Sequence, residues 1–173
     1  MCGIAGVMMR GGQPPSRDTL QALALALRHR GPDGQAVHVH GATGLVHARL
    51  AIVDLLGGAQ PLISADGVAL IANAEIYNDL DLRREMHDVS FATGSDCESP
   101  LHLYRKVGDV FAERLRGMYA IAISDSAQRR LILARDPFGI KPLYYAETPD
   151  GVCFASEPQA LIAAGLVVPR VNA

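Results

Sequence analysis

The sequence has few cysteines, little net charge and no long apolar run, and each of these absences excludes a class of protein. Its three cysteines, Cys2, Cys97 and Cys153, are an odd number without CxxC spacing, which argues against a disulfide or zinc framework and favours a reduced, cytoplasmic protein. The net charge of −2 argues against a general affinity for nucleic acid. No apolar stretch approaches the roughly 20 residues that span a bilayer, and the N-terminus lacks the basic and apolar regions of a signal peptide. We therefore expect a soluble globular protein, and 173 residues are enough for one domain with a sizeable core.

The sequence also lacks a phosphate-binding loop and a clear metal site. Gly11-Gly12 has neither the lysine nor the spacing of such a loop. His38 and His40 would share one face of a strand, where they either bind a metal or belong to a solvated face. We expect the solvated face and no metal site. Lys141, in the 135–145 segment, is expected in a packed strand–turn–strand or a domain contact rather than in an anion site.

The pattern along the chain predicts an α+β protein. Ser16 is a suitable N-cap for a first helix, with Asp18 in its first turn and with Leu20, Leu23, Ala24 and Leu27 at helical spacing. Further helices are predicted at 79–86, 97–106, 111–115 and 158–164, with Ser95 or Asp96 as the cap of the second of these. Strands are predicted at 3–8, 37–40, 45–53, 68–72, 118–124, 131–134 and 152–155. Runs of strands between helices favour antiparallel sheets covered by helices.

Cys2 directly follows the initiator methionine, and this position would allow it to become the N-terminal residue. Removal of Met1 would leave one residue with both a thiol and a free α-amine. An α-amine titrates near 7.7–8.0, so at neutral pH about a tenth or more of it is an unprotonated base. The thiol needs such a base to become an attacking thiolate. Taken alone, Cys2 also fits a small apolar residue on a first strand.

Eight segments follow one another in an order and at a spacing that match a known family. They are Met1-Cys2-Gly3-Ile4-Ala5-Gly6, Arg28-His29-Arg30-Gly31-Pro32-Asp33, 47–54, Gly58-Ala59-Gln60-Pro61-Leu62, 73–78, Ser95-Asp96-Cys97-Glu98, 135–145 and Phe154-Ala155-Ser156-Glu157. With them, the chain resembles the class II glutamine amidotransferase domain, in the form found at the N-terminus of glutamine-hydrolysing asparagine synthetases.

The resemblance implies a fold, a reaction and a division of the chain. The fold is the N-terminal-nucleophile hydrolase fold, a four-layer αββα sandwich of two antiparallel sheets between helical layers. Cys2 would attack the side-chain amide of L-glutamine while its α-amine shuttles the proton. A thioester would form, ammonia would leave, and water would release glutamate. Residues 1–165 would be this glutaminase domain, and 166–173 a tail or the start of a linker to a synthetase domain that the sequence does not contain.

The resemblance also implies partners and cofactors. The glutaminase step needs no cofactor, whereas ATP and magnesium are expected only in the synthetase domain or partner. That domain or subunit would use the ammonia at an asparagine-synthetase-like, amide-forming site. The expected partners are L-glutamine and the synthetase, without nucleic acid or membrane, and the resemblance admits a homodimer.

The candidate site residues suit the chemical groups of glutamine. Arg49 offers a planar fork for a carboxylate, Asp96 a charge for an ammonium, and Asn73 a donor where negative charge develops on the amide oxygen. Taken alone, they also fit a solvated strand-end arginine, a helix cap and a turn-forming asparagine. The resemblance makes Asn73 and the backbone N–H of Ala74 the oxyanion hole, places Glu75 at the pocket wall, and assigns the pocket lining to backbone groups of Leu50, Ala51, Ile52 and Val53.

Three departures from the family pattern leave alternatives open. Ala74 replaces the family's glycine, the 83–91 segment is shorter than usual, and Cys97 and Pro100 replace more typical residues after Asp96. One alternative is a regulatory or glutamine-binding module of the same fold, catalytically impaired by Ala74 or by a retained Met1. Another is an N-terminal-cysteine hydrolase of a different amide, which Arg49 and Asp96 argue against.

Overall fold

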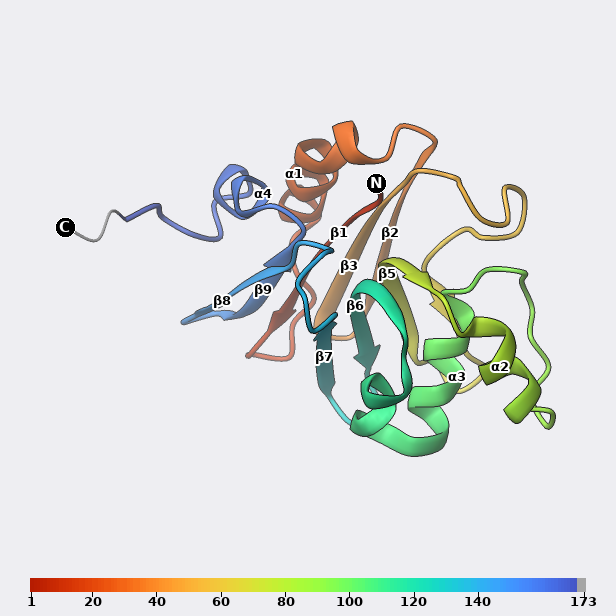
Figure 1. Cartoon of the computed structure of the whole chain (residues 1–173). Coiled ribbons are helices and arrows are strands. Elements are labelled where there is room, and N and C mark those ends of the chain that lie inside the picture. Colours follow the sequence, from red (N-terminus) through yellow and green to blue (C-terminus); the bar gives the residue numbers. More distant parts are fainter. Residues whose placement is uncertain (171–173) are drawn as a thin grey trace. The chain divides into compact units, whose positions relative to one another are not determined.

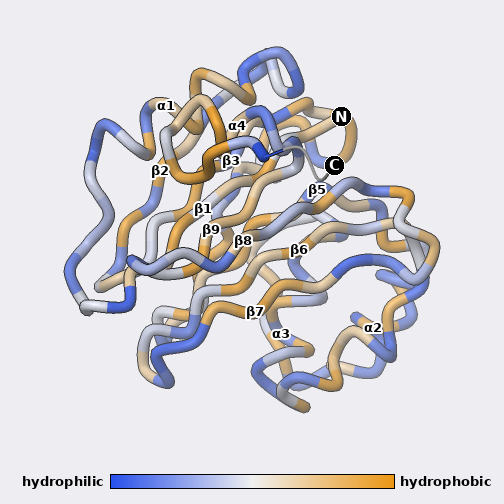
Figure 2. The backbone as a smooth tube through the Cα atoms, turned by 90° about the vertical axis from the view of Figure 1, so that its left-hand side faces the viewer, coloured by the Kyte–Doolittle hydropathy of each residue, from blue (hydrophilic) through white to orange (hydrophobic). Residues whose placement is uncertain are grey.

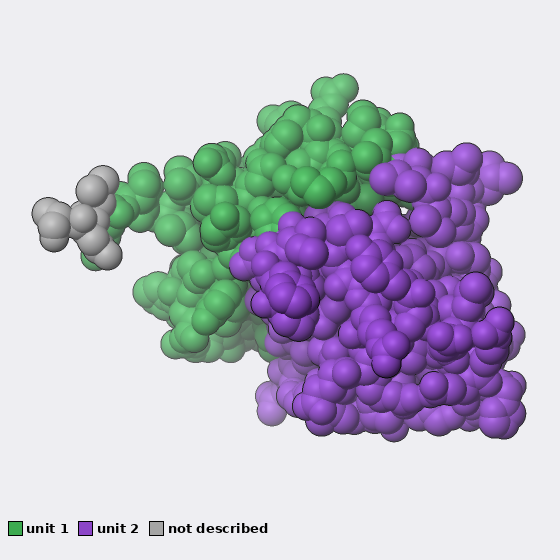
Figure 3. Space-filling view, viewed as in Figure 1, with its two compact units in different colours: residues 1–50, 142–173 green, residues 51–141 purple. Residues whose placement is uncertain are grey.

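The computed structural model describes residues 1–170. They form two antiparallel sheets, each with its own helices, and the connecting segments (Figure 1). The chain divides into two units (Figure 3). Unit 1 combines residues 1–50 with the chain from residue 142 onward, and unit 2 is residues 51–141. Apolar residues run along the strands of both units, and hydrophilic residues gather in the connections (Figure 2).

Unit 1 contains a five-stranded sheet in the order β2-β3-β1-β9-β8, so the strand that follows Cys2 lies in its centre. The strands are β1 (Gly3–Met9), β2 (Gly34–His40), β3 (Thr43–Arg49), β8 (Tyr144–Thr148) and β9 (Gly151–Ala155). The helices are α1 (Arg17–Leu27), the 3-10 helix η1 (Arg28–Arg30) and α4 (Pro158–Ala163). In the register, Gly3 is opposite Ala48 of β3, and Ala5 is opposite Ala155 of β9.

Helix α1 forms as its sequence predicts. Ser16 is its N-cap, and the Ser16 hydroxyl accepts the N–H of Thr19 at 3.0 Å, which satisfies one of the free donors of the first turn. Its buried residues are the four predicted ones, and they pack with residues of β1, β3, β9 and α4. Ile4, Leu45 and Phe154 are buried on the other face of the sheet. Residues on both faces of β1, the strand that follows Cys2, are therefore buried.

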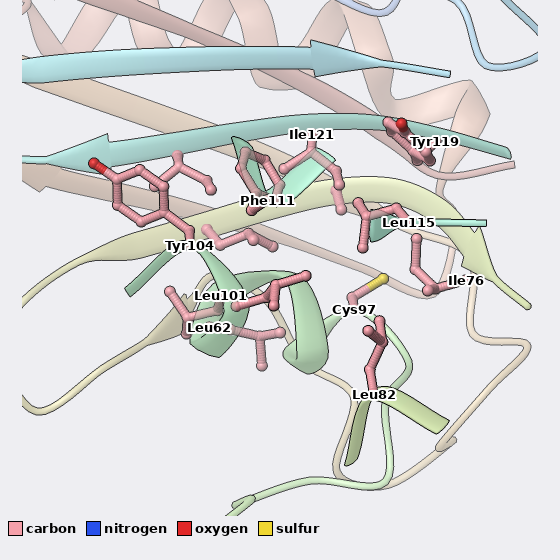
Figure 4. Packing of buried hydrophobic residues seen from close by; sticks show 14 of the residues in the cluster. Leu62, Ile76, Leu82, Cys97, Leu101, Tyr104, Phe111, Leu115, Tyr119 and Ile121 are labelled. Atoms are coloured by element: carbon pink, nitrogen blue, oxygen red, sulfur yellow. The ribbon is translucent and has the colours of Figure 1, made fainter. Parts of the chain in front are cut away.

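Unit 2 contains a four-stranded sheet in the order β4-β5-β6-β7. The strands are β4 (Leu62–Ile63), β5 (Ala69–Ile76), β6 (Gly117–Asp125) and β7 (Arg130–Arg135), and the helices are α2 (Asp79–Glu85), α3 (Glu98–Val107) and the 3-10 helix η2 (Gly108–Arg114). One face of β5 and β6 packs against these helices around Leu101, Phe111 and Ile121 (Figure 4). None of the helices within residues 1–170 is long and apolar enough to cross a membrane.

Three of the predicted elements are wrong in detail. Residues 51–53 form no strand, because β3 loses its partners after Arg49, which is opposite the first residue of β2. Strand β5 does not end before Asn73 but continues to Ile76, because β6 pairs with it as far as Gly117. Neither Ser95 nor Asp96 caps α3. Cys97 is its N-cap and makes no side-chain capping bond.

Candidate active site

The candidate residues are divided between the two units. Unit 1 contains Cys2, Arg49 and Leu50, and unit 2 contains Ala51, Ile52, Val53, Asn73, Ala74, Glu75 and Asp96. Within unit 1, the structure brings Cys2 into contact with Leu50. Within unit 2, it connects the strand of Asn73 to Asp96.

The thiol of Cys2 is held by one backbone position. Its sulfur accepts the N–H of Leu50 at 3.3 Å and lies 3.5 Å from the Leu50 carbonyl oxygen, to which it donates. Cys2 is half-buried, whereas Met1 is 55% exposed. The sulfur thus has a defined position just past the end of β3. The nitrogen of Cys2 is an amide as long as Met1 is attached.

Arg30 is a site residue to which the sequence analysis gave no role. Its Nε donates to the backbone carbonyl of Cys2 at 3.1 Å. The local signal for this arrangement is Gly31. A Cβ at that position would lie 2.2 Å from the Ala48 carbonyl carbon and 2.3 Å from the Arg49 nitrogen, so only glycine lets η1 approach β3 this closely. Arg49 is half-buried, and its carbonyl accepts the N–H of Asp33 at 3.0 Å.

In unit 2, the edge of β5 that faces away from β6 presents three backbone N–H groups in a row. Ala72 donates its N–H to the Gln60 side chain at 2.6 Å, and Ile76 donates its N–H to the Asp96 carboxylate at 2.6 Å. Strand alternation directs the N–H of Ala74, between them, to the same edge. Among residues 1–170, no acceptor is recorded for it. One backbone donor thus remains available between two that are occupied.

The side chain of Asn73 provides a second available donor next to the first. Asn73 is 2% exposed, and its Nδ2 is buried without a partner among the described residues. A buried donor without an acceptor costs about 1–3 kcal/mol, so such groups are rare and call for an explanation. Two adjacent donors, one side-chain and one backbone, are what an oxyanion hole needs.

Ala74 accommodates the loss of the family's glycine without strain. The non-glycine residues with positive φ in the described chain are Asp54 and Arg129. Ala74 instead belongs to extended strand β5, opposite Tyr119. Its Cβ therefore carries none of the penalty that alanine pays in the left-handed region.

Asp96 lies at the other end of this edge, two residues before α3. Burial raises the pKa of its carboxyl group, and the N–H of Ile76 opposes this shift while the charge of Asp79 adds to it. Ionised, Asp96 is an anion short of compensating charge, which is the state that an added cation would stabilise.

The 51–53 segment is irregular, and Asp54 fixes its end. Asp54 has φ 47°, and its carboxylate accepts the N–H of Gly57 at 2.9 Å and that of Gly94 at 2.8 Å. Ile52 and Val53 are exposed and Glu75 is half-buried. The segment after Leu50 is therefore tied to the loop that leads to Asp96, a contact between residues 40 positions apart that the sequence did not reveal.

The two histidines of β2 form a close pair. Their ring centroids are 6.4 Å apart, and burial lowers the pKa of His38, with His40 lowering it further. Within residues 1–170, no three or more His, Cys, Asp or Glu side chains are grouped so as to hold a metal ion.

Comparison with solved structures identifies the class of fold. The chain is similar to the glutamine phosphoribosylpyrophosphate amidotransferase of B. subtilis complexed with ADP and GMP, with a TM-score of 0.74 at 22% identity, over 95% of this chain and 44% of that one. A structure described as the allosteric regulatory enzyme of purine biosynthesis matches with a TM-score of 0.76 at 24% identity, over 95% and 43%. The predicted fold, α+β with two antiparallel sheets and helices, is confirmed.

Comparison of sequences then gives the family. The model of the glutamine amidotransferase domain matches residues 1–173, so the chain belongs to the glutamine amidotransferase domain family. It is 39% identical over 165 residues to asparagine synthetase [glutamine-hydrolyzing] 2 of Bacillus subtilis, and 43% identical over 164 residues to asparagine synthetase [glutamine-hydrolyzing] 3 of Arabidopsis thaliana. Each match covers 93% of this chain but 22% and 28% of those proteins. The predicted resemblance is confirmed, and the chain spans about a quarter of the length of these relatives.

Proposed function

We propose that this chain hydrolyses the side-chain amide of L-glutamine to glutamate and ammonia. Membership of the family supports this reaction. The observation that carries it is the pair of available donors on β5, the buried Nδ2 of Asn73 and the N–H of Ala74. A protein that keeps a buried donor unpaired bears a cost in stability, and the binding of an oxyanion explains why the cost is tolerated.

The reaction requires prior removal of Met1, which frees the α-amine of Cys2. The amine takes the thiol proton, and the thiolate sulfur attacks the amide carbon to give a tetrahedral oxyanion. Asn73 and the Ala74 N–H stabilise that oxyanion. When it collapses, the C–N bond breaks, the α-amine delivers the proton to the leaving ammonia, and a γ-glutamyl thioester remains on Cys2. Water then cleaves the C–S bond and restores the thiol.

Recognition of glutamine would use both of its charged ends. Arg49 binds the α-carboxylate with its planar fork, and Asp96 binds the α-ammonium. The buried carboxylate of Asp96 gains most from such a partner because its charge is poorly compensated. Backbone groups of residues 50–53 and the side chain of Glu75 line the pocket in this proposal.

The ammonia would serve an amide-forming site like that of an asparagine synthetase. We assign residues 1–165 to the glutaminase domain and 166–173 to a tail or linker, of which 171–173 lie outside the described residues. The glutaminase step needs no cofactor in this proposal, and ATP and magnesium belong to the synthetase domain or subunit. A cytoplasmic location and a homodimer remain predictions.

The test is glutamate release from glutamine, with the N-terminal mass measured on the same sample. Activity should appear only in chains that have lost Met1, and Cys2→Ala should abolish it. One equivalent of a glutamine-like electrophile should label Cys2 and spare Cys97 and Cys153, which are 5% and 1% exposed and serve as internal controls. Full activity of Cys2→Ala, or of chains shown to retain Met1, would refute the proposal.

A further inference from the structure

The Phe154–Glu157 segment matches the family but has no role in the reaction as described so far. Its first two residues end β9, and its last two connect to the N-terminal segment of the chain, Ser156 directly and Glu157 through Arg30. Ser156 donates its N–H to the Ile4 carbonyl at 2.8 Å and accepts the Ile4 N–H on its hydroxyl at 3.0 Å. Glu157 binds Arg30 through Nη1 at 2.7 Å, and Arg30 binds the Cys2 carbonyl through Nε.

We propose that Glu157 is a positioning residue for Cys2 and acts through Arg30. This inference rests on the proposed glutaminase function. Arg30 reaches Cys2 with one nitrogen and Glu157 with another, so its guanidinium spans the two. Because a guanidinium is planar and rigid, fixing it at Glu157 also fixes the direction of the Nε–H at Cys2. The Cys2 carbonyl is thereby held, and with it the orientation of the residue that carries both nucleophile and amine.

The burial of Arg30 makes this contact more than a surface ion pair. Its side chain is 9% exposed, against 26% for Glu157, and its Nη2 is buried without a partner among the described residues. A buried cation needs a partner at short distance, and removal of that partner leaves it uncompensated. Burial alone would raise the pKa of Glu157, but its contacts with Arg30 and His29 lower it, so the carboxylate is charged at neutral pH.

The packing around Arg30 leaves it little freedom to find another position. A Cβ on Gly3 would lie 3.3 Å from Cδ of Arg30 and 3.3 Å from Cβ of Leu27, so the aliphatic stem of Arg30 already fills the space beside the first strand. His29 also contacts the Glu157 carboxylate, at 3.0 Å, but its side chain is 61% exposed. Glu157 can therefore be substituted without disturbing the packing of Arg30 against β1, so it is the residue through which this network is tested.

The experiment compares Glu157→Ala, Glu157→Gln and Glu147→Ala in chains with a processed N-terminus. Glu147 is an exposed glutamate on β8 of the same sheet and serves as the matched control. In Glu157→Ala, kcat for glutamine should fall about 10- to 100-fold, while KM stays within about threefold, because the groups that bind the amino-acid end are untouched. Gln keeps an acceptor for Arg30, so Glu157→Gln should recover kcat to within about threefold of wild type.

A second readout needs no turnover. The rate of Cys2 alkylation by iodoacetamide, followed by peptide mass, should rise about threefold or more in Glu157→Ala, because a half-buried thiol that loses its position becomes more accessible. Glu157→Gln and Glu147→Ala should alkylate at the wild-type rate. Circular dichroism at the assay temperature gives the folded fraction to which both rates are normalised.

The possible outcomes separate this inference from the proposed function. A wild-type chain without Met1 that releases no glutamate refutes the glutaminase, and the alkylation rates then still decide whether Glu157 positions Cys2. An active wild type with an equally active Glu157→Ala refutes the positioning role alone. The role is also refuted if the loss appears in KM only, or if Glu157→Gln recovers no more kcat than Glu157→Ala.

Discussion

At the scale of the residue, Asn73 has a buried side chain whose environment costs stability, and the proposed oxyanion hole would explain that cost. It is buried in strand β5 and holds a donor that no described group accepts. Asn78, four residues after Ala74, shows the opposite arrangement. Its Nδ2 donates to the Arg114 carbonyl at 3.0 Å, and its Oδ1 accepts the Arg116 N–H at 2.9 Å.

This contrast predicts opposite results for two asparagine-to-alanine changes. Asn73→Ala should lower kcat about 10²–10³-fold, with a melting temperature equal to or above that of wild type, because it removes an unpaired buried donor. Asn78→Ala should lower the free energy of unfolding by about 1–3 kcal/mol, since two satisfied hydrogen bonds are lost. Thermal melts and glutamate release on the same preparations check both. A lower melting temperature in Asn73→Ala would show that its amide has a structural partner.

Replacing Ala74 with glycine should change kcat only slightly. Because the residue is extended, glycine offers its N–H no better direction. Ala74→Gly should therefore change kcat by less than about tenfold, a ΔΔG‡ of about 1.4 kcal/mol. Steady-state kinetics on glutamine measure it. A rise of a hundredfold or more would indicate an impaired oxyanion hole and support the regulatory-module alternative.

At the scale of the element, structure that depends on neighbouring residues was predicted well from the sequence, and structure that depends on contacts between distant segments was not. Helix α1 needed only the Ser16 cap and a 3.6-residue repeat, both of which act within a few positions. Residues 51–53 are as apolar as a strand, but a strand also needs a neighbour, and the pairing ends at Arg49. The positions of the candidate residues came from the family pattern. The roles of Gln60 and Asp54 depend on contacts between distant segments, which no local pattern encodes, whereas Gly31 is a local signal for the contact of Arg30.

The junction between β5 and α3 yields a prediction that depends on pH. Burial and Asp79 raise the pKa of Asp96 above its ordinary value of 3.8, so the folded chain holds this proton more tightly than the unfolded chain does. The free energy of unfolding therefore falls as pH rises from 3.8 through the raised pKa that Asp96 has in the folded chain. Asn cannot ionise, yet it still offers Ile76 an acceptor. Asp96→Asn should melt higher than wild type above that range and equally below pH 3.8.

The same variant should be a poorer enzyme. Loss of the charged partner of the ammonium should lower kcat/KM by roughly 30- to 150-fold at neutral pH. Asp81→Asn, at an exposed aspartate on α2, is the control and should change neither property. Melting curves between pH 3 and 8 and kinetics at pH 7 test the pair. An unchanged kcat/KM in Asp96→Asn would remove Asp96 from substrate recognition.

At the scale of the whole molecule, the chain matches only part of its relatives. It covers 22% of the Bacillus subtilis synthetase and 28% of the Arabidopsis thaliana one. The 173 residues contain no phosphate-binding loop. We expect the purified chain to release ammonia from glutamine without consuming ATP. Coupled assays for glutamate and for ADP, with and without glutamine, separate the two activities. Glutamine-dependent ATP hydrolysis by this chain would contradict the expectation.

The edge of β5 also bears on how the protein avoids aggregation. An uncovered strand edge offers alternating donors and acceptors that can recruit a strand from another molecule. Here Gln60 and Asp96 bind the N–H groups on either side of Ala74. A strand from another molecule would find one free N–H donor, whereas pairing requires a row of free donors and acceptors. Beyond the two residues that β4 pairs, this side of β5 thus keeps one free donor, and we expect that replacing Gln60 with an apolar residue would offer a second one to intermolecular pairing.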